Sequence, residues 1–116
     1  LKVHCKLCLI TREEKSGPVR YGVIGTGNFN ENTAKIYSDH HLLTTDKRLT
    51  REIDKVFDFF ANNYNVPRFK HFLVSPFDTR KMLMKHIRKE IKNQIEGKEA
   101  YIILKLNNLT LITLEN

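Results

Sequence analysis

Apolar and polar residues alternate along the start of the chain, which is the pattern of a β-strand. The alternation runs over residues 2–11, a polar turn follows over 12–18, and a second strand is predicted over 19–26. The first strand places Val3, Cys5, Leu7 and Leu9 on one face and His4, Lys6, Cys8 and Ile10 on the other. The pattern therefore predicts an antiparallel hairpin.

The middle of the chain changes from a strand pattern to a helical one. We expect a short helical turn over 31–36, with Asn30 as its N-cap, and a third strand over 38–44. A helix is predicted over 46–62 because apolar residues there recur every three or four positions. Its predicted buried stripe consists of Leu49, Ile53, Val56, Phe57 and Phe60.

The last third predicts a second helix between two short strands at 72–74 and 100–106. The run Ser75–Asp78 has the form of a helix start, with Ser75 as N-cap, proline at the first helical position and Asp78 completing a capping box. Gly97 is the expected stop. The predicted buried stripe of this helix is Leu83, Ile87, Ile91 and Ile95.

A hairpin followed by alternating strands and helices indicates the α/β or α+β class, with a mixed sheet and flanking helices. The Asn- and Pro-containing stretch 62–70 is the best candidate linker, so we expect two units, 1–64 and 65–116. His4 leaves no room for an element before the first strand. We therefore interpret the chain as an incomplete internal piece of a longer parent protein, exposing surfaces that the parent buries.

Charge and composition narrow the choice of partner. Lys and Arg number 20 against 13 Asp and Glu, a formal net charge of +7, which favours a polyanion such as polyphosphate, nucleotide, nucleic acid or acidic lipid. No apolar segment approaches the roughly 20 residues of a transmembrane helix. On the second helix, basic residues outnumber acidic ones and form either a solvated face or the lining of a polyanion path: Arg80, Lys81, Lys85, Arg88, Lys89 and Lys92.

Cys5 and Cys8 have the C-x-x-C spacing of some zinc and redox sites. In a strand, however, residues three apart point to opposite faces, and no second ligand pair completes a four-ligand set. We therefore predict no metal site in the chain. Two unpaired thiols fit a reducing cytoplasm.

Candidate chemistry lies near the start of the chain. In a strand His4 and Lys6 share one face, which sets an imidazole beside a fixed positive charge. The glycine segment 25–30 then brings backbone N–H groups and two amide side chains to the end of the next strand. A nucleophile, a cation and a loop open to close approach are what the handling of a phosphate requires. His40 and His41 are adjacent, so at most one could join a site, and both are read as structural.

These residues carry a resemblance to a known superfamily. His4-x-Lys6 followed by Gly25-Thr26-x-Asn28 is similar to the H-x-K…G-S-x-N half-site of the phospholipase D superfamily. Longer strings resemble the C-terminal catalytic region of bacterial polyphosphate kinases, and the likeness continues through Leu109. Those strings are Val3–Leu7, Tyr21–Glu31, Thr33–Tyr37, Leu42–Thr44, Val74–Pro76 and Leu104–Leu109.

The resemblance implies a role for each residue. His4 takes the γ-phosphate of ATP as a phosphohistidine, for which a neutral imidazole is a competent nucleophile near pH 7. Lys6 holds phosphate oxygens, and Asn28 orients phosphate or His4. The nucleotide and phosphate contacts fall to Tyr37 and to the loop residues Gly25, Thr26 and Gly27.

The resemblance also implies a partner set. It implies reversible transfer between ATP and inorganic polyphosphate, magnesium held by residues outside this chain, a cytoplasmic parent with membrane association left open, and a homo-oligomer without a specific nucleic-acid partner. Only the first of two half-sites is present, so we expect the isolated chain to be inactive. Residues 110–116 depart from what the resemblance leads us to expect.

Two alternatives stay open. A phospholipase D-type phosphodiesterase or nuclease would use the same His4 and Lys6. Many such motifs carry an acidic residue seven positions after the histidine, where this chain has Thr11, which favours the kinase branch. A polyanion-binding module without chemistry would show salt-dependent binding that survives His4→Ala.

Overall fold

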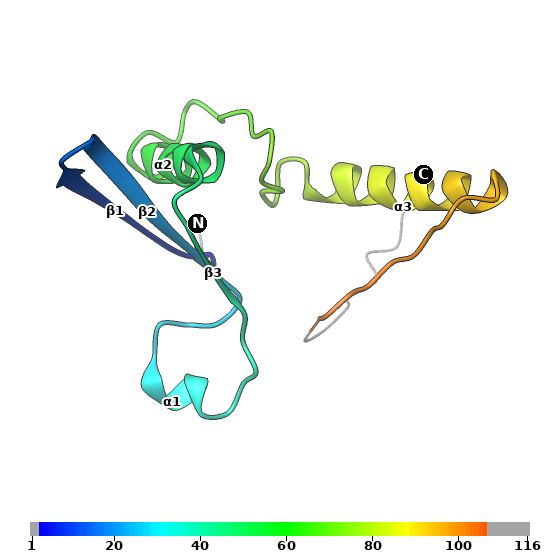
Figure 1. The fold of residues 1–116 in the computed structure, drawn as a ribbon, viewed down its shortest axis with the longest axis horizontal. Helices are drawn as coiled ribbons and strands as arrows, with labels where there is room; N and C mark the ends of the chain where they lie inside the picture. Colours follow the sequence, from blue (N-terminus) through cyan, green and yellow to red (C-terminus); the bar gives the residue numbers. More distant parts are fainter. Residues whose placement is uncertain (1–2, 107–116) are drawn as a thin grey trace. The chain divides into compact units, whose positions relative to one another are not determined.

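The computed structural model describes residues 3–106 and divides the chain into two compact units, 1–72 and 73–116. This division falls after Phe72, whereas the boundary predicted from the sequence falls after Tyr64. The first unit contains a sheet and two helices, and the second contains one long helix (Figure 1).

The first two strands form the expected hairpin. β1 (Lys6–Glu14) pairs antiparallel with β2 (Gly17–Gly25), from Lys6 opposite Gly25 to Glu14 opposite Gly17. The predicted seven-residue turn over 12–18 is wrong, because pairing continues until only Lys15 and Ser16 remain between the strands. Gly17 makes the tight turn possible, since its φ of 100° is a conformation that side chains disfavour. Residues 3–5 precede β1, so the predicted strand over 2–11 starts too early.

A third strand completes an antiparallel sheet. β3 (His41–Thr44) pairs with β2, giving the order β1-β2-β3. Between β2 and β3 the chain forms the short helix α1 (Glu31–Ala34), which Figure 1 shows in the connection between the two strands. Asn30 is its N-cap, as predicted, and its side-chain oxygen accepts hydrogen bonds from the Asn32 and Thr33 backbone N–H groups at 2.9 and 3.2 Å.

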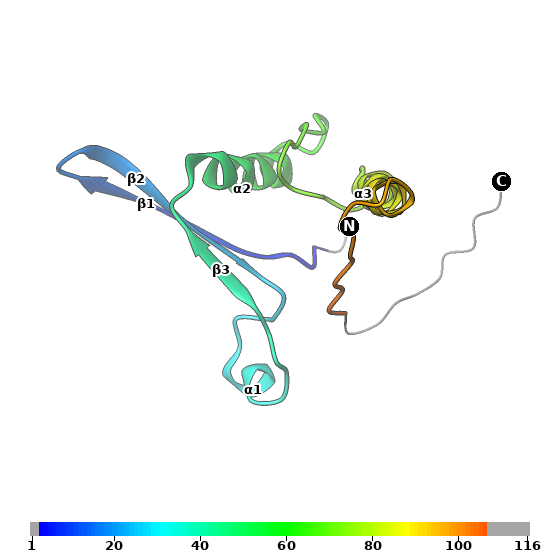
Figure 2. The ribbon, with the colours of Figure 1, turned by 45° about the vertical axis from the view of Figure 1, so that its right-hand side comes forward.

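Helix α2 (Lys47–Ala61) packs on the hairpin (Figure 2). Ile53 and Val56 of the predicted stripe are buried, and within residues 3–106 they are the only buried hydrophobic side chains. A Cβ on Gly22 would lie 2.6 Å from Ile53 Cδ1, so the glycine lets helix and strand approach closely. Phe57 and Phe60, predicted to be buried, are 40% and 41% exposed, and their rings meet edge to face with centroids 6.2 Å apart.

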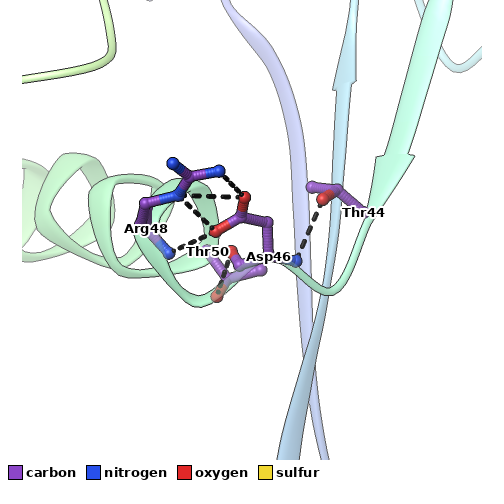
Figure 3. A network of polar contacts seen from close by, with 4 residues as sticks. All are labelled: Thr44, Asp46, Arg48 and Thr50. Carbon is purple, nitrogen blue, oxygen red and sulfur yellow. Dashed lines mark hydrogen bonds and ion pairs between the residues drawn. The ribbon is translucent and has the colours of Figure 1, made fainter.

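A polar network fixes the start of α2 (Figure 3). The Asp46 carboxylate is the N-cap and accepts from the Arg48 backbone N–H at 2.8 Å, while the Arg48 guanidinium holds both carboxylate oxygens. Thr44 accepts from the Asp46 N–H, and Thr50 donates to the Asp46 carbonyl. The Arg48 side-chain and backbone hydrogen bonds lower the pKa of Asp46 to about 2.

Glu52, on the same helix, is a buried carboxylate with only 4% exposure. It accepts hydrogen bonds from three consecutive backbone N–H groups, those of Lys70, His71 and Phe72, at 2.7 to 3.2 Å. Burial raises the pKa of Glu52, but the three donors and nearby His71 outweigh it, so the pKa lies below its ordinary value. Glu52 thus holds the segment that ends the first unit against α2.

The second unit contains helix α3 (Thr79–Ile95). The predicted start at Ser75 is wrong, because residues 75–78 form turns in which the Phe77 and Asp78 N–H groups both donate to the Val74 carbonyl. Asp78 is the N-cap but makes no side-chain cap hydrogen bond. The helix ends where predicted, with Gly97 at a φ of 70°.

The predicted buried stripe of α3 is also wrong for the described residues. Leu83, Ile91 and Ile95 are 41%, 54% and 80% exposed, and no residue of the helix is buried. Nothing described in the second unit covers this apolar face.

The strands predicted over 72–74 and 100–106 do not form within residues 3–106. An extended segment becomes a strand only when a neighbour pairs with its backbone, and these segments have none there. The sheet is therefore antiparallel rather than mixed, and the fold class is α+β. Residues 107–116, which include the whole of the departing stretch 110–116, lie outside the described residues. None of the described helices is both long and apolar enough to cross a bilayer.

Candidate functional site

The candidate site begins with two side chains beside the first strand. His4 lies two residues before Lys6, and Lys6 is the first residue of β1. His4 is therefore outside the paired strand, whereas Lys6 is inside it. Lys6 Nζ lies 3.0 Å from His4 Nε2 and donates to the His4 carbonyl oxygen at 2.7 Å. The imidazole and the ammonium group are thus in direct contact, although the strand alternation used to predict this does not extend to His4.

This contact indicates which imidazole nitrogen is free of a proton. An ammonium group only donates hydrogen bonds, so Nε2 of His4 accepts from Lys6. The imidazole proton is then on Nδ1, and the lone pair on Nε2 lies beside a positive charge. Such a nitrogen can attack an electrophile whose negative oxygens the lysine attracts.

The two side chains border a pocket of about 240 Å³. Asn28 and Phe29, from the loop after β2, line it together with His4 and Lys6. The loop reaches the pocket because Gly25, the last residue of β2, is paired with Lys6. Three predicted catalytic residues, His4, Lys6 and Asn28, therefore lie around one pocket. The remaining lining residues are Val3, Cys5 and Leu7.

The two glycines of the loop are in contact with the segment before and at the start of β3. A Cβ on Gly27 would overlap the Asp39 carboxylate, and one on Gly25 would lie 2.7 Å from His41 Nε2. Gly27 is buried. A side chain at Gly27 would therefore displace the Asp39 carboxylate, and one at Gly25 would displace the exposed His41 ring, whatever ligand the loop also approaches.

Thr26, between the two glycines, connects the loop by hydrogen bonds to residues 39 and 40, just before β3. Its hydroxyl donates to Asp39 Oδ1 and accepts from the His40 backbone N–H, both at 3.0 Å. Its own N–H donates to the His40 carbonyl, also at 3.0 Å. The Phe29 and His41 rings lie 5.8 Å apart at 35°. These contacts position the backbone that carries Asn28.

Tyr37, the predicted nucleotide contact, is 56% exposed and does not line the pocket. Its N–H donates to the Thr33 carbonyl just after α1. Gly25, Thr26 and Gly27, the other predicted contact residues of the loop, likewise do not line the pocket.

Sequence reasoning missed Asp39 and left His41 as structural without a contact. The signal for Asp39 was weak, because a single aspartate thirteen residues from Thr26 shows no spacing that identifies a partner. Only the return of the chain through α1 into β3 brings it to the loop.

The described part of the chain offers no ready metal site. Between residues 3 and 106, no three His, Cys, Asp or Glu side chains converge where a metal ion could be held. Cys5 and Cys8 are free thiols. The magnesium that the resemblance implies is therefore not matched by a set of ligands in these residues.

Two family models match the chain and together cover nearly all of it. Polyphosphate kinase C-terminal domain 1 matches residues 1–66, and polyphosphate kinase C-terminal domain 2 matches residues 72–114. The second match continues through residue 114 and so takes in part of the stretch 110–116 that departs from the resemblance.

Individual relatives agree with the family models. The chain is 50% identical to a polyphosphate kinase of Salmonella typhimurium and 51% identical to one of Klebsiella pneumoniae, each over 109 residues that make up 94% of the chain. It spans 16% of the length of these relatives.

A solved structure also matches the fold. The polyphosphate kinase from Porphyromonas gingivalis superposes with a TM-score of 0.71 at 33% identity, over 84% of this chain and 16% of that one. With both C-terminal domain models matched, and relatives half identical over almost its whole length, this chain belongs to the polyphosphate kinase family.

Proposed function

We propose that this chain is the segment of an ATP:polyphosphate phosphotransferase that carries its nucleophile, and that His4 is that nucleophile. The observation that carries the proposal is the 3.0 Å contact between His4 Nε2 and Lys6 Nζ at the rim of a pocket that Asn28 also lines. The names of the family and its relatives supply the reaction.

The reaction has two displacements. In the first, the Nε2 lone pair attacks the γ-phosphorus of ATP, the bond from that phosphorus to the bridging oxygen breaks, and ADP leaves with the electron pair. In the second, a terminal oxygen of polyphosphate attacks the phosphorus and the N–P bond breaks. The chain grows by one phosphate and His4 is again neutral. The reverse sequence makes ATP.

Lys6 supports both displacements electrostatically. Its hydrogen bond to the His4 carbonyl, at 2.7 Å, keeps the ammonium group beside the nucleophile. When a phosphoryl group arrives, Lys6 exchanges its bond to Nε2 for one to a phosphoryl oxygen, which frees the lone pair. A fixed cation at this point stabilises the charge on the equatorial oxygens of the transition state.

The other assignments follow from the same family membership. Asn28 orients the phosphoryl group or His4 from the far side of the pocket, and Gly25, Thr26 and Gly27 hold the backbone that presents it. Tyr37 contacts the nucleotide. Magnesium accompanies the phosphates with ligands from outside this chain, and the parent protein is a cytoplasmic homo-oligomer with a domain boundary near residues 64–65.

The test uses the full-length parent protein. It is incubated with γ-labelled ATP and magnesium, and acid-labile, base-stable label is mapped to a peptide. We expect label on the His4 peptide, its loss in His4→Ala, and its transfer into polymer when polyphosphate is added.

His86→Ala serves as the matched control, because it removes an exposed histidine on α3 and leaves the loop and the nucleophile in place. Label that persists in His4→Ala would refute the assignment of the nucleophile. Cleavage of a diester substrate with no label from ATP would instead identify a phosphodiesterase.

A further inference from the structure

Helix α3 carries five basic side chains on one side. With 3.6 residues per turn, each residue is rotated by about 100° from the one before, and these five fall within an arc of about 100°. All five are exposed. We call this set the basic stripe: Lys81, Lys85, Arg88, Lys89 and Lys92.

Few acidic side chains among the described residues neutralise the charge of the basic stripe. Within residues 3–106 only Lys92 of the basic stripe makes an ion pair, with Glu96 at 3.5 Å. Glu90, the one acidic residue inside α3, lies outside the arc and accepts from the Asn93 side-chain amide at 3.3 Å. Like charges three and four residues apart destabilise a helix, so a bound anion relieves repulsion within the stripe.

The length of the basic stripe favours a chain of anions over a single one. Lys81 and Lys92 are eleven residues apart, which corresponds to about 16 Å along the helix. A lone phosphate reaches one or two of the five cations, whereas a linear polyanion lying along α3 reaches all of them.

The composition of α3 favours a polyanion without bases over a single-stranded nucleic acid. Proteins that hold single-stranded nucleic acid combine cations with aromatic side chains on which bases stack. The 17 residues of α3 include no Phe, Tyr or Trp. The basic stripe therefore offers charge without a surface for stacking, which suits a polyanion that has no bases.

We propose that the basic stripe of α3 binds inorganic polyphosphate. This rests on the proposed function, which makes polyphosphate a substrate of the parent protein, and adds a binding surface in the second unit to the nucleophile in the first. The surface holds the polymer through exposed cations, so the interaction depends strongly on salt.

The experiment measures binding of fluorescently labelled polyphosphate to the full-length parent protein carrying His4→Ala, so that no phosphoryl transfer occurs. The test variant adds Lys85→Gln and Lys89→Gln. The matched control adds Lys47→Gln and Arg51→Gln, two exposed cations with the same four-residue spacing on α2. Circular dichroism checks that all variants keep their helix content.

We expect the test variant to bind about tenfold more weakly near physiological salt, and its slope of log affinity against log salt to fall by about 2. The control should change affinity less than twofold. Equal effects in test and control variants would overturn the proposal. Tighter binding of single-stranded DNA than of polyphosphate, lost with the same two lysines, would also overturn it.

Failure of this proposal is distinguishable from failure of the proposed function. Labelling of His4 from ATP is measured in the protein that retains His4, and polymer binding is measured in the protein that lacks it. If His4 is labelled but polyphosphate binding does not depend on the basic stripe, only the proposed binding surface is refuted. If polyphosphate binding depends on the basic stripe but His4 is not labelled, only the assignment of the nucleophile is refuted.

Discussion

At the residue scale, the contact between His4 and Lys6 makes a specific prediction about charge. Lys6→Gln removes the ammonium group next to Nε2 and should slow labelling of His4 by γ-labelled ATP by roughly 10²- to 10³-fold, the size seen when one electrostatic donor to a transition state is lost. Single-turnover labelling of the full-length protein measures this. Lys6→Arg keeps the charge and should lose less. Labelling of Lys6→Gln at the rate of the unmodified protein would show that the charge plays no part.

Gly27 makes a second prediction at this scale. Gly27→Ala forces a methyl group into the Asp39 carboxylate and should destabilise the fold by about 1–3 kcal/mol, as overpacking does. In an Asp39→Gly background the same change should cost less than half as much, because the obstructing carboxylate is gone. Chemical unfolding of the four proteins gives the coupling. Equal costs in both backgrounds would mean that Asp39 is not the obstruction.

These two sites show what sequence can predict about residues. The approach of the loop before Asn28 to Lys6 followed from the predicted hairpin, which is local. The contact of His4 with Lys6 was predicted from a strand alternation that does not extend to His4, although a spacing of two residues still brings the side chains together. The roles of Asp39 and His41 did not follow from the sequence, because they depend on how the chain returns through α1 to pair β3 with β2. Contacts made by a chain reversal leave no periodicity to detect.

At the element scale, the start of α2 predicts a dependence on pH. The pKa of Asp46 is about 2 in the folded protein and 3.8 ordinarily, so its charged form is favoured by folding. Its contribution to stability is complete above about pH 4 and is lost as pH falls toward 2. Carboxyl chemical shifts of Asp46, followed by NMR, should titrate near 2.

Asp46→Asn is the matched control for that titration. Asparagine caps a helix well but carries no charge for Arg48 to hold. The variant should therefore lose the part of the acid dependence that arises between about pH 4 and 2 at the start of α2. A midpoint for Asp46 near 3.8 would contradict the bidentate contact with Arg48.

Glu52 makes the second prediction about an element. Glu52→Gln replaces one acceptor oxygen with an amide NH2 group, a donor that faces backbone donors, and should cost about 1–3 kcal/mol. Amide hydrogen exchange should rise most at Lys70, His71 and Phe72. Glu90→Gln, on the more exposed helix α3, is the control and should leave those three amides unchanged. Equal protection in Glu52→Gln would mean that the segment is held by other contacts.

The elements also show where helical periodicity succeeds and fails. It located α2 and α3 within a few residues, because the helical repeat of apolar residues and the capping residues are both properties of the local sequence. It misplaced the start of α3, where Val74 accepts from both Phe77 and Asp78 and keeps 75–78 in turns. It also predicted strands over 72–74 and 100–106, whose formation depends on neighbours that a single sequence does not reveal.

At the scale of the whole molecule, the small core decides how the chain behaves alone. Ile53 and Val56 are the buried hydrophobic residues of the described chain, whereas Ile91, Ile95 and Ile103 are 54%, 80% and 84% exposed. Since the chain spans 16% of its relatives' length, we expect these side chains to be covered in the parent protein. Expressed alone, the 116 residues should bind a hydrophobic dye, associate at high concentration and transfer no phosphate from ATP to polymer.

Replacing Ile91 and Ile95 with Gln separates exposure from instability as the cause of that association. Both side chains are exposed, so their loss removes apolar surface without opening a cavity, and dye binding and association should fall while the helix content stays the same. Ile53→Ala is the opposing control, because it empties the core beneath α2 and should increase dye binding. An Ile91 and Ile95 variant that loses its helix would show that these residues already pack within the isolated chain.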